Sequence, residues 1–439
     1  MATESSIMDS NSFKEEYASM LSPKTREMIS KREKYLGGAY RLFYRKPLNI
    51  VRGEGDYLWD GEGNKYLDMY NNVAGVGHCN PAVVEAVTEQ MKTLNTHTRY
   101  LHEKILDYSE ELLELMPDEI NKIMYMCTGS EANDLALRVA EAYTGGTGII
   151  ITQEAYHGTS ALTSGCSPSL GAGQPLLPNV RLIPEEFTAW YASEMQKTID
   201  ELNEAGYKFS CFLADSIFSS DGIYPDPVGF LKATVDVVHK NGGVFIADEV
   251  QPGFARTGQA FFGFARHGIV PDMITMGKPM GNGIPISGLA AKEDVLAAFS
   301  DKLPYFNTFG GNPVSIAAAQ AVLKYIKDEN LQEHCKKAGA ALLKALKEVQ
   351  ERHPESVGDV RGAGLFLGFE FVKNDGNKTP DKDMALNVIE MLRDEHILTS
   401  VIGHYGNILK LRPPMVFSEN DIDWFATSLD KCITKLENK

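Results

Sequence analysis

The sequence lacks several features that mark whole classes of protein. No stretch approaches about eighteen consecutive apolar residues, so no membrane-spanning helix is expected. The first residues, MATESSIMDS, contain no apolar core and do not resemble a secretory signal. Basic residues are outnumbered, with 43 Lys and Arg against 59 Asp and Glu and a net charge of −16. This balance argues against binding to nucleic acid or to an anionic membrane, and we expect a cytoplasmic enzyme.

Disulfide and metal-ligand patterns are also missing. The six cysteines are scattered along the chain, and none forms a C-x-x-C pair. In a chain of 439 residues they indicate free or buried thiols, not a disulfide framework or a zinc site. His78, His97 and His102 are not at the spacing of metal ligands, so we expect no metal site.

The most regular pattern in the chain is an alternation of strands and helices between about residue 80 and residue 310. Short apolar runs are separated by helical patterns; the runs are KIMYMC, TGIIIT, KFSCFLA, GGVFIAD and DMITMG. Several runs are continuously apolar, which is typical of strands that are covered on both faces. The spacing predicts an α/β fold with a mainly parallel, doubly wound sheet.

The two ends of the chain have a different pattern. Residues 1–45 have helical patterns, and GDYLWDGEGNKYLDM then predicts two short strands around a turn. After about residue 311 a long helical segment precedes strand-like GLFLGFEFV, more helix and NILKLRPPM. We expect an N-terminal segment (1–74) that joins a small C-terminal domain (311–439), and a large domain between them (75–310).

Polar groups follow the first two predicted strands. TGSEANDLALRVAEAY comes after the first, and its Thr128 and Glu131 have the spacing of a helix-capping box. A strand, a glycine turn and a helix N-terminus together can bind a phosphate, although an ordinary capped helix gives the same pattern. AYHG follows the second strand, where Tyr156 provides either an aromatic face in a cleft or core packing.

Charged groups follow the later strands. Asp248 and Glu249 end the GGVFIAD run, and a carboxylate at a strand tip is either solvated or paired. Lys278 follows DMITMG and is flanked by glycine and proline. A lone lysine is commonly a solvated surface charge, but an amine at the mouth of a cleft also forms Schiff bases with carbonyl compounds.

Pyridoxal 5′-phosphate (PLP) requires this set of groups. In open α/β sheets ligands bind beyond the carboxyl ends of the strands, so the groups are expected at one edge of one sheet. The phosphate would bind at the helix N-terminus, and the ring would stack on Tyr156. Asp248 would keep the ring nitrogen protonated, and Lys278 would hold the aldehyde as an imine. The sequence therefore predicts a PLP enzyme with Lys278 and Asp248 as its catalytic residues.

Six motifs occur in order along most of the chain: TGSEAND, AYHG, IADEVQPGFARTG, TMGKPMGNGIPIS, NTFGGNP and LRPPM. Together they resemble the class III, or ω-amino-acid type, aminotransferase family. The resemblance implies the fold-type I architecture of PLP enzymes, with a central seven-stranded sheet in a large domain and a small domain built from both termini. It also implies a homodimer with active sites at the interface, and leaves open whether dimers form a tetramer.

The resemblance also implies roles for residues of these motifs. Lys278 corresponds to the Schiff-base lysine and Asp248 to the partner of the pyridine nitrogen. The other cofactor-binding positions are Gly129 and Ser130 at the phosphate, Tyr156 and Val250 on the two ring faces, Gln251 at the phenolic oxygen, and Thr308, which reaches the neighbouring subunit's phosphate. Arg412 corresponds to the arginine that binds a substrate carboxylate. Substrate choice is expected to depend on the segments around Tyr70, Ser219 and Arg412, and Arg256 has no assigned role.

Two departures from the family pattern narrow the choice of substrate. Ser220 stands where the family often has a glutamate that neutralises Arg412, and Thr159 stands where several dicarboxylate-binding members have an arginine. The segments NNVAGVGHCNPAVVEAV and FNTFGGNPVS resemble a subgroup of alanine–glyoxylate type aminotransferases and phospholyases.

These resemblances leave two main reactions open. We expect transfer of an amino group from a primary amine or ω-amino acid to a keto acid such as pyruvate or glyoxylate. The alternative is a PLP-dependent lyase that eliminates ammonia, with or without phosphate, from a phosphoethanolamine-like or aminophosphonate substrate. Racemisation and a non-enzymatic binding protein are the lesser alternatives.

Overall fold

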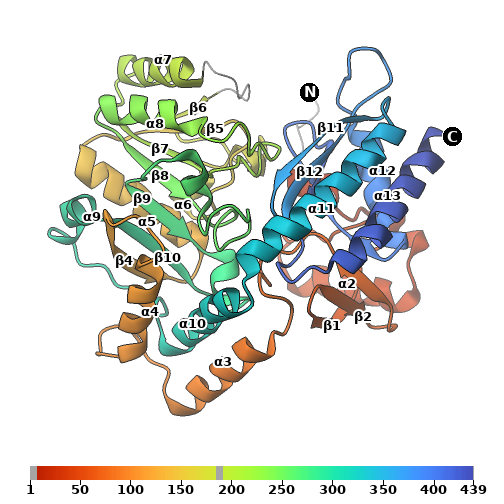
Figure 1. Cartoon of the computed structure of the whole chain (residues 1–439), viewed down its shortest axis with the longest axis horizontal. Helices are drawn as coiled ribbons and strands as arrows, with labels where there is room; N and C mark the ends of the chain where they lie inside the picture. Colours follow the sequence, from red (N-terminus) through yellow and green to blue (C-terminus); the bar gives the residue numbers. More distant parts are fainter. Residues whose placement is uncertain (1–6, 184–190, 439) are drawn as a thin grey trace.

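The largest sheet of the molecule has seven strands in the order β4-β10-β9-β8-β7-β5-β6, and it lies in the left lobe of Figure 1. The computed structural model describes residues 7–183 and 191–438. All neighbouring strands of this sheet are parallel except β10, which runs antiparallel to β4 and β9. The strands are β4 (Ile120–Met126), β5 (Gly148–Thr152), β6 (Val180–Ile183), β7 (Phe209–Ala214), β8 (Val244–Asp248), β9 (Met273–Met276) and β10 (Ser287–Lys292). The predicted α/β fold with a mainly parallel sheet is confirmed.

Helices cover both faces of this sheet, which explains the continuously apolar strands. Every residue of β5, β7, β8 and β9 is buried. Ile149 and Ile151 belong to the apolar cluster of α5 (Gly129–Thr144) and α9 (Glu293–Ser300). Ile150 belongs to the cluster on the opposite face, which includes α7 (Tyr191–Glu204) and α8 (Leu231–Lys240).

Two strands of the sheet were not among the predicted runs. β6 has only four residues, of which the middle two are half-buried. β10 has the sequence SGLAAK, which contains no β-branched residue and only one large apolar one. Strand preference at such positions comes from pairing with neighbours more than from composition, so neither segment has a clear pattern of its own.

Both ends of the chain build the second lobe, on the right of Figure 1. One sheet combines β1 (Ile50–Glu54), β2 (Tyr57–Asp60) and β3 (Lys65–Asp68) with β13 (Ile397–Leu398), which is parallel to β3. The other is antiparallel and consists of β11 (Val357–Ala363), β12 (Phe366–Phe371), β15 (Ile408–Leu411) and β14 (Ser400–Ile402). The helices of this lobe include α11 (Leu331–Arg352), α12 (Lys382–Asp394) and α13 (Ile422–Glu437). A small α+β domain from both termini is therefore confirmed, while its boundaries at residues 74 and 311 remain a prediction.

The predicted helices differ from the observed ones in two places. The long helical segment after residue 311 is split into α10 (Pro313–Asp328) and α11, because Asn330 has a φ of 48° in the left-handed region. The helical pattern of residues 1–45 forms α1 (Ile7–Ser10), a 3₁₀ helix over Glu15–Met20 and α2 (Pro23–Tyr35), and its first six residues lie outside the described part of the chain. Among the described helices, none is long and apolar enough to cross a membrane.

Candidate active site

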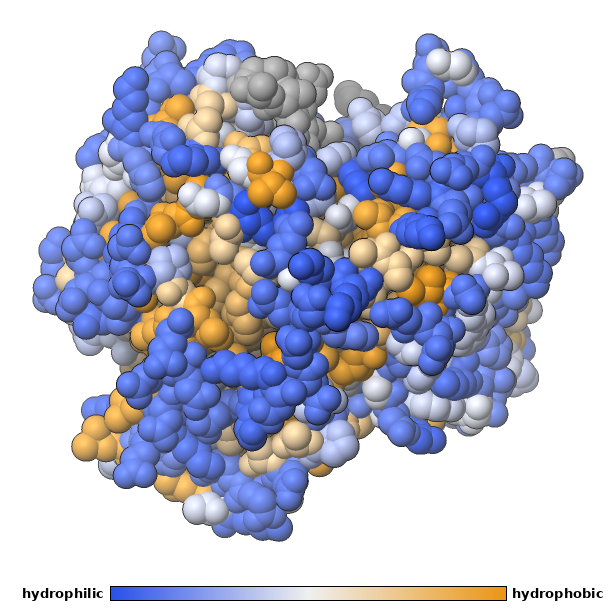
Figure 2. All heavy atoms as spheres, in the orientation of Figure 1, coloured by the Kyte–Doolittle hydropathy of each residue, from blue (hydrophilic) through white to orange (hydrophobic). Residues whose placement is uncertain are grey.

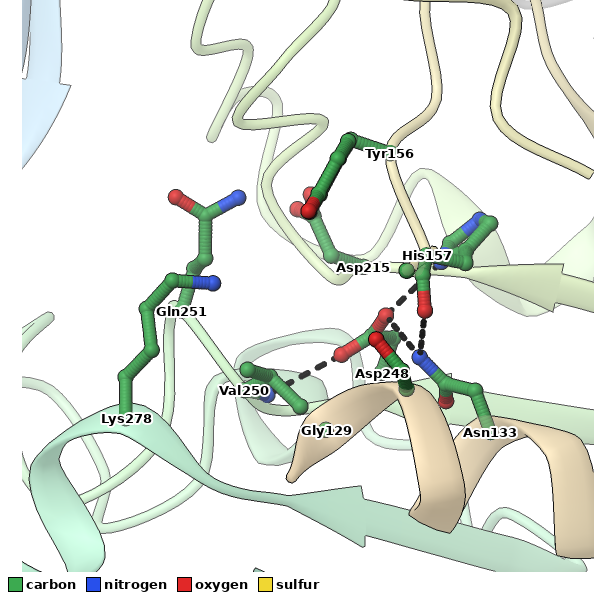
Figure 3. A pocket seen from close by; sticks show the side chains of 11 residues that line it. Gly129, Asn133, Tyr156, His157, Asp215, Asp248, Val250, Gln251 and Lys278 are labelled. Carbon is green, nitrogen blue, oxygen red and sulfur yellow. Dashed lines mark hydrogen bonds and ion pairs between the residues drawn. The ribbon is translucent and has the colours of Figure 1, made fainter. Parts of the chain in front are cut away.

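One pocket lies at the carboxyl edge of the large sheet, where several strands end next to one another. β8 ends at Asp248, and β9 ends two residues before Lys278. The pocket is lined by Gly129, Ser130, Asn133, Tyr156, His157, Gly158, Asp215, Asp248, Val250, Gln251 and Lys278. Figure 3 shows these side chains converging from separate segments of the chain. The parallel sheet thus brings together most of the residues that the sequence identifies.

Asp248 is held by three donors from different elements. Its Oδ2 accepts from Asn133 Nδ2 at 2.9 Å and pairs with His157 Nδ1 at 2.7 Å, and its Oδ1 accepts from the Val250 backbone N–H at 3.1 Å. Thr275 Oγ1 donates to Asn133 Oδ1 at 2.6 Å and so orients the amide. Burial by itself raises the pKa of Asp248, but the hydrogen bonds and charge of His157, with the other donors, outweigh it, and the pKa lies below its ordinary value. The carboxylate is therefore ionised in a buried position.

Glu249, the next residue, has a different environment. Its carboxylate accepts hydrogen bonds from Ser216 Oγ and from the backbone N–H groups of Gly263 and Phe264, at 2.7 to 2.9 Å. Burial raises the pKa of Glu249 to about 7 against these hydrogen bonds. Glu249 does not line the pocket. It fixes the loop after β8, so that of these two adjacent carboxylates only Asp248 lines the pocket.

Lys278 begins a 3₁₀ helix over Lys278–Gly281, directly after β9. Its Nζ lies 5.9 Å from the centre of the Tyr156 ring, and Figure 3 shows the side chain extending into the pocket beside Gln251. Burial and the charge of Arg412 lower the pKa of Lys278 to about 8, although Asp248 and Asp215 act in the opposite direction. A lysine with this pKa has a substantial neutral fraction near pH 8, as a nucleophile or a general base requires.

The N-terminus of α5 faces the same pocket. Thr128 is the N-cap, and the capping box with Glu131 is present as the sequence predicts. Gly158, with φ of 138°, lies so close to this turn that an added Cβ would be 2.5 Å from Ser130 Oγ. The backbone N–H groups at Gly129 and Ser130 are those that an α-helix leaves without internal partners, and they favour an anion.

Gln251 connects the pocket to two buried cations. Its Oε1 accepts a hydrogen bond from Lys410 Nζ at 3.0 Å and another from Arg412 Nη1. Arg412 also donates from Nε and Nη2 to the Tyr70 backbone oxygen at 3.2 Å, and its guanidinium lies 5.3 Å from the Tyr70 ring centre. Tyr70 and Arg412, expected at the substrate, are thus in contact with each other.

The other predicted site residues occupy less central positions. Ser219 is buried and donates from Oγ to Asp215 Oδ2 at 2.7 Å, so it contacts the pocket through Asp215. Thr308 is exposed and does not line the pocket of its own chain. Its expected contact with a neighbouring subunit remains a prediction.

Arg256 is fully buried and links the loop after β8 to the second lobe. Its Nη1 donates to the backbone oxygens of Leu365 and Pro413 at 2.9 and 2.7 Å. Burial lowers the pKa of Arg256 to about 9. These contacts place Arg256 at the junction of the lobes, one residue from the Arg412 backbone, and give it a positioning role that the sequence did not reveal.

Several pocket residues were not identified from the sequence, although signals for them were present. Asn133 and His157 lie within motifs that point to the phosphate and the ring, and Asp215 follows a predicted strand. Lys410 does not line the pocket but contacts its residue Gln251; it stands two residues before Arg412, and side chains two apart in an extended strand face the same side. Among the described residues no cluster of His, Cys, Asp and Glu could hold a metal ion.

The residues present fit PLP as a ligand. The helix N-terminus at Gly129 offers free backbone donors for a phosphate, and the ionised Asp248 lies deep in the same pocket as a partner for a protonated ring nitrogen. Tyr156 offers an aromatic face, and Lys278 offers an amine of lowered pKa. A Cβ added at Gly129 would lie 3.1 Å from the Val250 side chain, so the N-terminus of α5 packs closely against the residue that follows Asp248 by two.

Comparisons with known proteins agree with this geometry. A sequence model described as aminotransferase class-III matches residues 43–433. A Drosophila melanogaster protein named alanine–glyoxylate aminotransferase 2-like is 38% identical over 430 residues, which cover 93% of this chain and 87% of the relative. A Caenorhabditis elegans protein named ethanolamine-phosphate phospho-lyase homolog 1 is 36% identical over 437 residues, which cover 93% of each chain. The solved structure of a phospholyase from Arthrobacter in complex with phosphoethanolamine aligns with a TM-score of 0.89 and 37% identity, over 93% of this chain and 99% of that one.

Proposed function

The chain belongs to the class III aminotransferase family of PLP-dependent enzymes, and we propose that it transfers an amino group from a primary amine or ω-amino acid to a keto acid such as pyruvate or glyoxylate. The observation that carries this proposal is the placement of Lys278 and Asp248 in one pocket at the carboxyl edge of the sheet. Arg412 is reached from that pocket through Gln251.

The protein's own groups each have a defined task in this reaction. When bound, PLP supplies an electron sink for the carbon next to the substrate amine. Lys278 would hold the cofactor through its aldehyde, and its amine would serve as the base that takes the proton from that carbon. Asp248, kept ionised by His157 and Asn133, would hold a proton on the ring nitrogen.

The remaining site residues hold the reactants in place. Gly129 and Ser130 would bind the cofactor phosphate, and Tyr156 and Val250 would lie beside its ring. Gln251 would bind its phenolic oxygen, and Thr308 would bind the phosphate of the neighbouring subunit. On the substrate side, Arg412 binds the acidic group of the amine or keto acid, with Tyr70 and the loop of Ser219 shaping the space around it.

Elimination is the second candidate reaction, and a specific observation favours it. The Arthrobacter structure that aligns over 93% of this chain is a phospholyase in complex with phosphoethanolamine. Ser220, in place of a glutamate that would neutralise Arg412, also suits a site that binds an anion in every turnover. An elimination needs no keto acid, because phosphate or another group leaves the adjacent carbon and water hydrolyses the resulting enamine to ammonia and an aldehyde.

One assay separates the two reactions. The purified holoenzyme is incubated with phosphoethanolamine, with hydroxylated aminoethylphosphonate or with β-alanine, each with and without pyruvate. Released ammonia, phosphate and alanine are measured, with Lys278→Ala as the inactive control. Turnover only with pyruvate, with alanine accumulating, supports the aminotransferase. Repeated turnover without a keto acid, with ammonia released, would contradict the aminotransferase proposal and support the lyase.

The proposal includes a homodimer, and the surface of the large lobe supports it. Exposed apolar side chains gather on α3 (Pro81–Thr93), on α4 (Glu103–Leu113) and on the segments beside them; they include Val84, Met91, Leu94, Tyr100, Leu101, Leu106, Phe306 and Phe309. His97 contacts both Tyr100 and Phe306, so the two loops form one surface with Thr308. Figure 2 shows hydrophobic patches where Figure 1 places α3 and α4. A second copy of the chain is the partner that this surface fits.

The proposal also places the enzyme in the cytoplasm. All six cysteines are free thiols, and four of them are buried. Free thiols are usual in reducing compartments. Fractionation of cells that express the protein, followed by detection of the chain, tests this part of the proposal.

A further inference from the structure

Lys410 and Arg412 form an unusual pair of cations beside the pocket. Both are almost completely buried, with 6% and 4% of their surface exposed. Both donate to one atom, the neutral Oε1 of Gln251, which lines the pocket together with Lys278. Two basic side chains therefore converge on a single uncharged acceptor at the edge of the site.

No carboxylate balances this pair directly. Among the described ion pairs none includes Lys410 or Arg412, and the two acids that act on them electrostatically have partners of their own. Asp215 is hydrogen-bonded within its own loop. Asp68 pairs with His78 at 2.7 Å. Burial, reinforced by the charges of Arg412 and Lys278, lowers the pKa of Lys410 well below its ordinary value.

A buried cation without a counter-ion is costly, so an anion in the site would stabilise the charged forms of both side chains. A carboxylate carries one negative charge and would leave one cation uncompensated. A phosphate or phosphonate carries close to two charges on one compact group. Because both cations meet at one atom, the two charges must also lie on one group and not on two separate carboxylates.

We propose that Lys410 and Arg412 together bind a dianionic group of the substrate, so that the enzyme selects amines that carry a phosphate ester or a phosphonate over amines that carry one carboxylate. The guanidinium of Arg412 suits a two-pronged contact with the anion, and Lys410 supplies a point charge. An oxygen of the anion would take the place of Gln251 Oε1 as their shared acceptor. The inference rests on the PLP chemistry proposed above and holds for transamination and for elimination.

Two amines that differ only in their acid group test the inference. β-Alanine and 2-aminoethylphosphonate have the same carbon skeleton, and their dissociation constants are measured from the absorbance change of the holoenzyme at about pH 8, where phosphate-type groups are dianions. We expect the wild type to bind the phosphonate at least tenfold more tightly. In Lys410→Met the ratio of the dissociation constant of β-alanine to that of the phosphonate should fall below threefold. The phosphonate should bind more weakly, while the affinity for β-alanine should change little.

Controls distinguish this role from a structural one. Lys324→Met removes an exposed lysine on α10 that pairs with Asp328, and it should leave the ratio unchanged. Lys410→Met replaces a buried charge with an apolar side chain of similar length, so we expect it to fold with an unchanged or higher melting temperature. If that variant fails to fold, the preference of the wild type for the phosphonate over β-alanine alone decides whether the inference holds.

The inference would be overturned by a wild-type preference below threefold, or by an unchanged preference in Lys410→Met, whether or not both amines bind more weakly there. Failure to bind either amine also overturns it. None of these results affects the proposed amino-group transfer, because that depends on the requirement for pyruvate and is measured with other amines as well.

Discussion

The adjacent carboxylates Asp248 and Glu249, at the end of β8, have separate tasks, and single substitutions should distinguish them. Asp248→Asn keeps the shape of the side chain but removes the charge that would hold a proton on the cofactor ring. We expect kcat to fall by about 10²-fold or more, the scale of losing one electrostatic contact to the reacting group. Steady-state kinetics at saturating cofactor measure the effect, and circular dichroism confirms that the variant folds.

Glu249→Gln is the matched control for that substitution. The amide keeps only one of the two carboxylate oxygens that receive hydrogen bonds from Ser216, Gly263 and Phe264. We expect a loss of about 1–3 kcal/mol in the free energy of unfolding, because a buried donor is left unsatisfied, with a much smaller change in kcat. Equal losses of activity in the two variants would contradict the division of roles.

The lowered pKa of Lys278 predicts how the cofactor-free protein captures PLP as a function of pH. Only the neutral amine attacks an aldehyde, so the rate should rise as pH increases through about 8 and then level off. The absorbance change on mixing protein with PLP measures the rate. A midpoint near the ordinary lysine value of 10.5 would show that burial and Arg412 do not act as inferred.

Arg412→Gln tests whether the charge of Arg412 helps to lower the pKa of Lys278. The charge of Arg412 is one of the groups that lower the pKa of Lys278. Without it the protonated amine is less disfavoured, and the midpoint of the capture profile should move to higher pH. An unmoved midpoint would assign the whole shift to burial.

At the scale of elements, the close approach of the loop after β5 to the N-terminus of α5 builds the phosphate site. Gly158 has a φ of 138°, and a Cβ there would lie 2.5 to 2.7 Å from Ser130 atoms. Gly158→Ala should push the loop away from the helix and weaken PLP binding at least tenfold, measured by equilibrium dialysis. Gly173→Ala, where no atom lies within 4 Å of an added Cβ, should bind PLP as the wild type does.

The strand ends were predictable because a parallel sheet imposes their placement. Once GGVFIAD and DMITMG are taken as neighbouring parallel strands, Asp248 and Lys278 must meet at one edge. β10 was not predictable in the same way, since its residues are small and its strand conformation depends on pairing with β4 and β9. Lys410 was missed because a lysine in an apolar strand is ordinarily solvated.

At the scale of the whole molecule, the site joins segments that are far apart in the sequence. Tyr70 comes from the N-terminal segment, Gln251 and Lys278 from the large sheet, and Arg412 from the C-terminal lobe. Sequence motifs indicate the chemistry of each segment, but the shared hydrogen bonds at Gln251 Oε1 depend on how the two lobes pack. That packing is set by contacts such as the Arg256 bonds to Leu365 and Pro413, which no local pattern reveals.

The exposed apolar surface predicts the assembly of the whole molecule. Leu101, between α3 and α4, is 99% exposed, and a fully exposed leucine within an apolar surface indicates a covered interface. We expect light scattering to give twice the chain mass of 48.4 kDa for the wild type. Leu101→Asp should shift the mass toward one chain, because a charge cannot be buried there without a partner. It should also weaken PLP binding if Thr308 contacts the neighbouring phosphate.

Val228→Asp changes an exposed side chain outside this surface and should leave the mass unchanged. A wild type that is monomeric at micromolar concentration would contradict the proposed dimer.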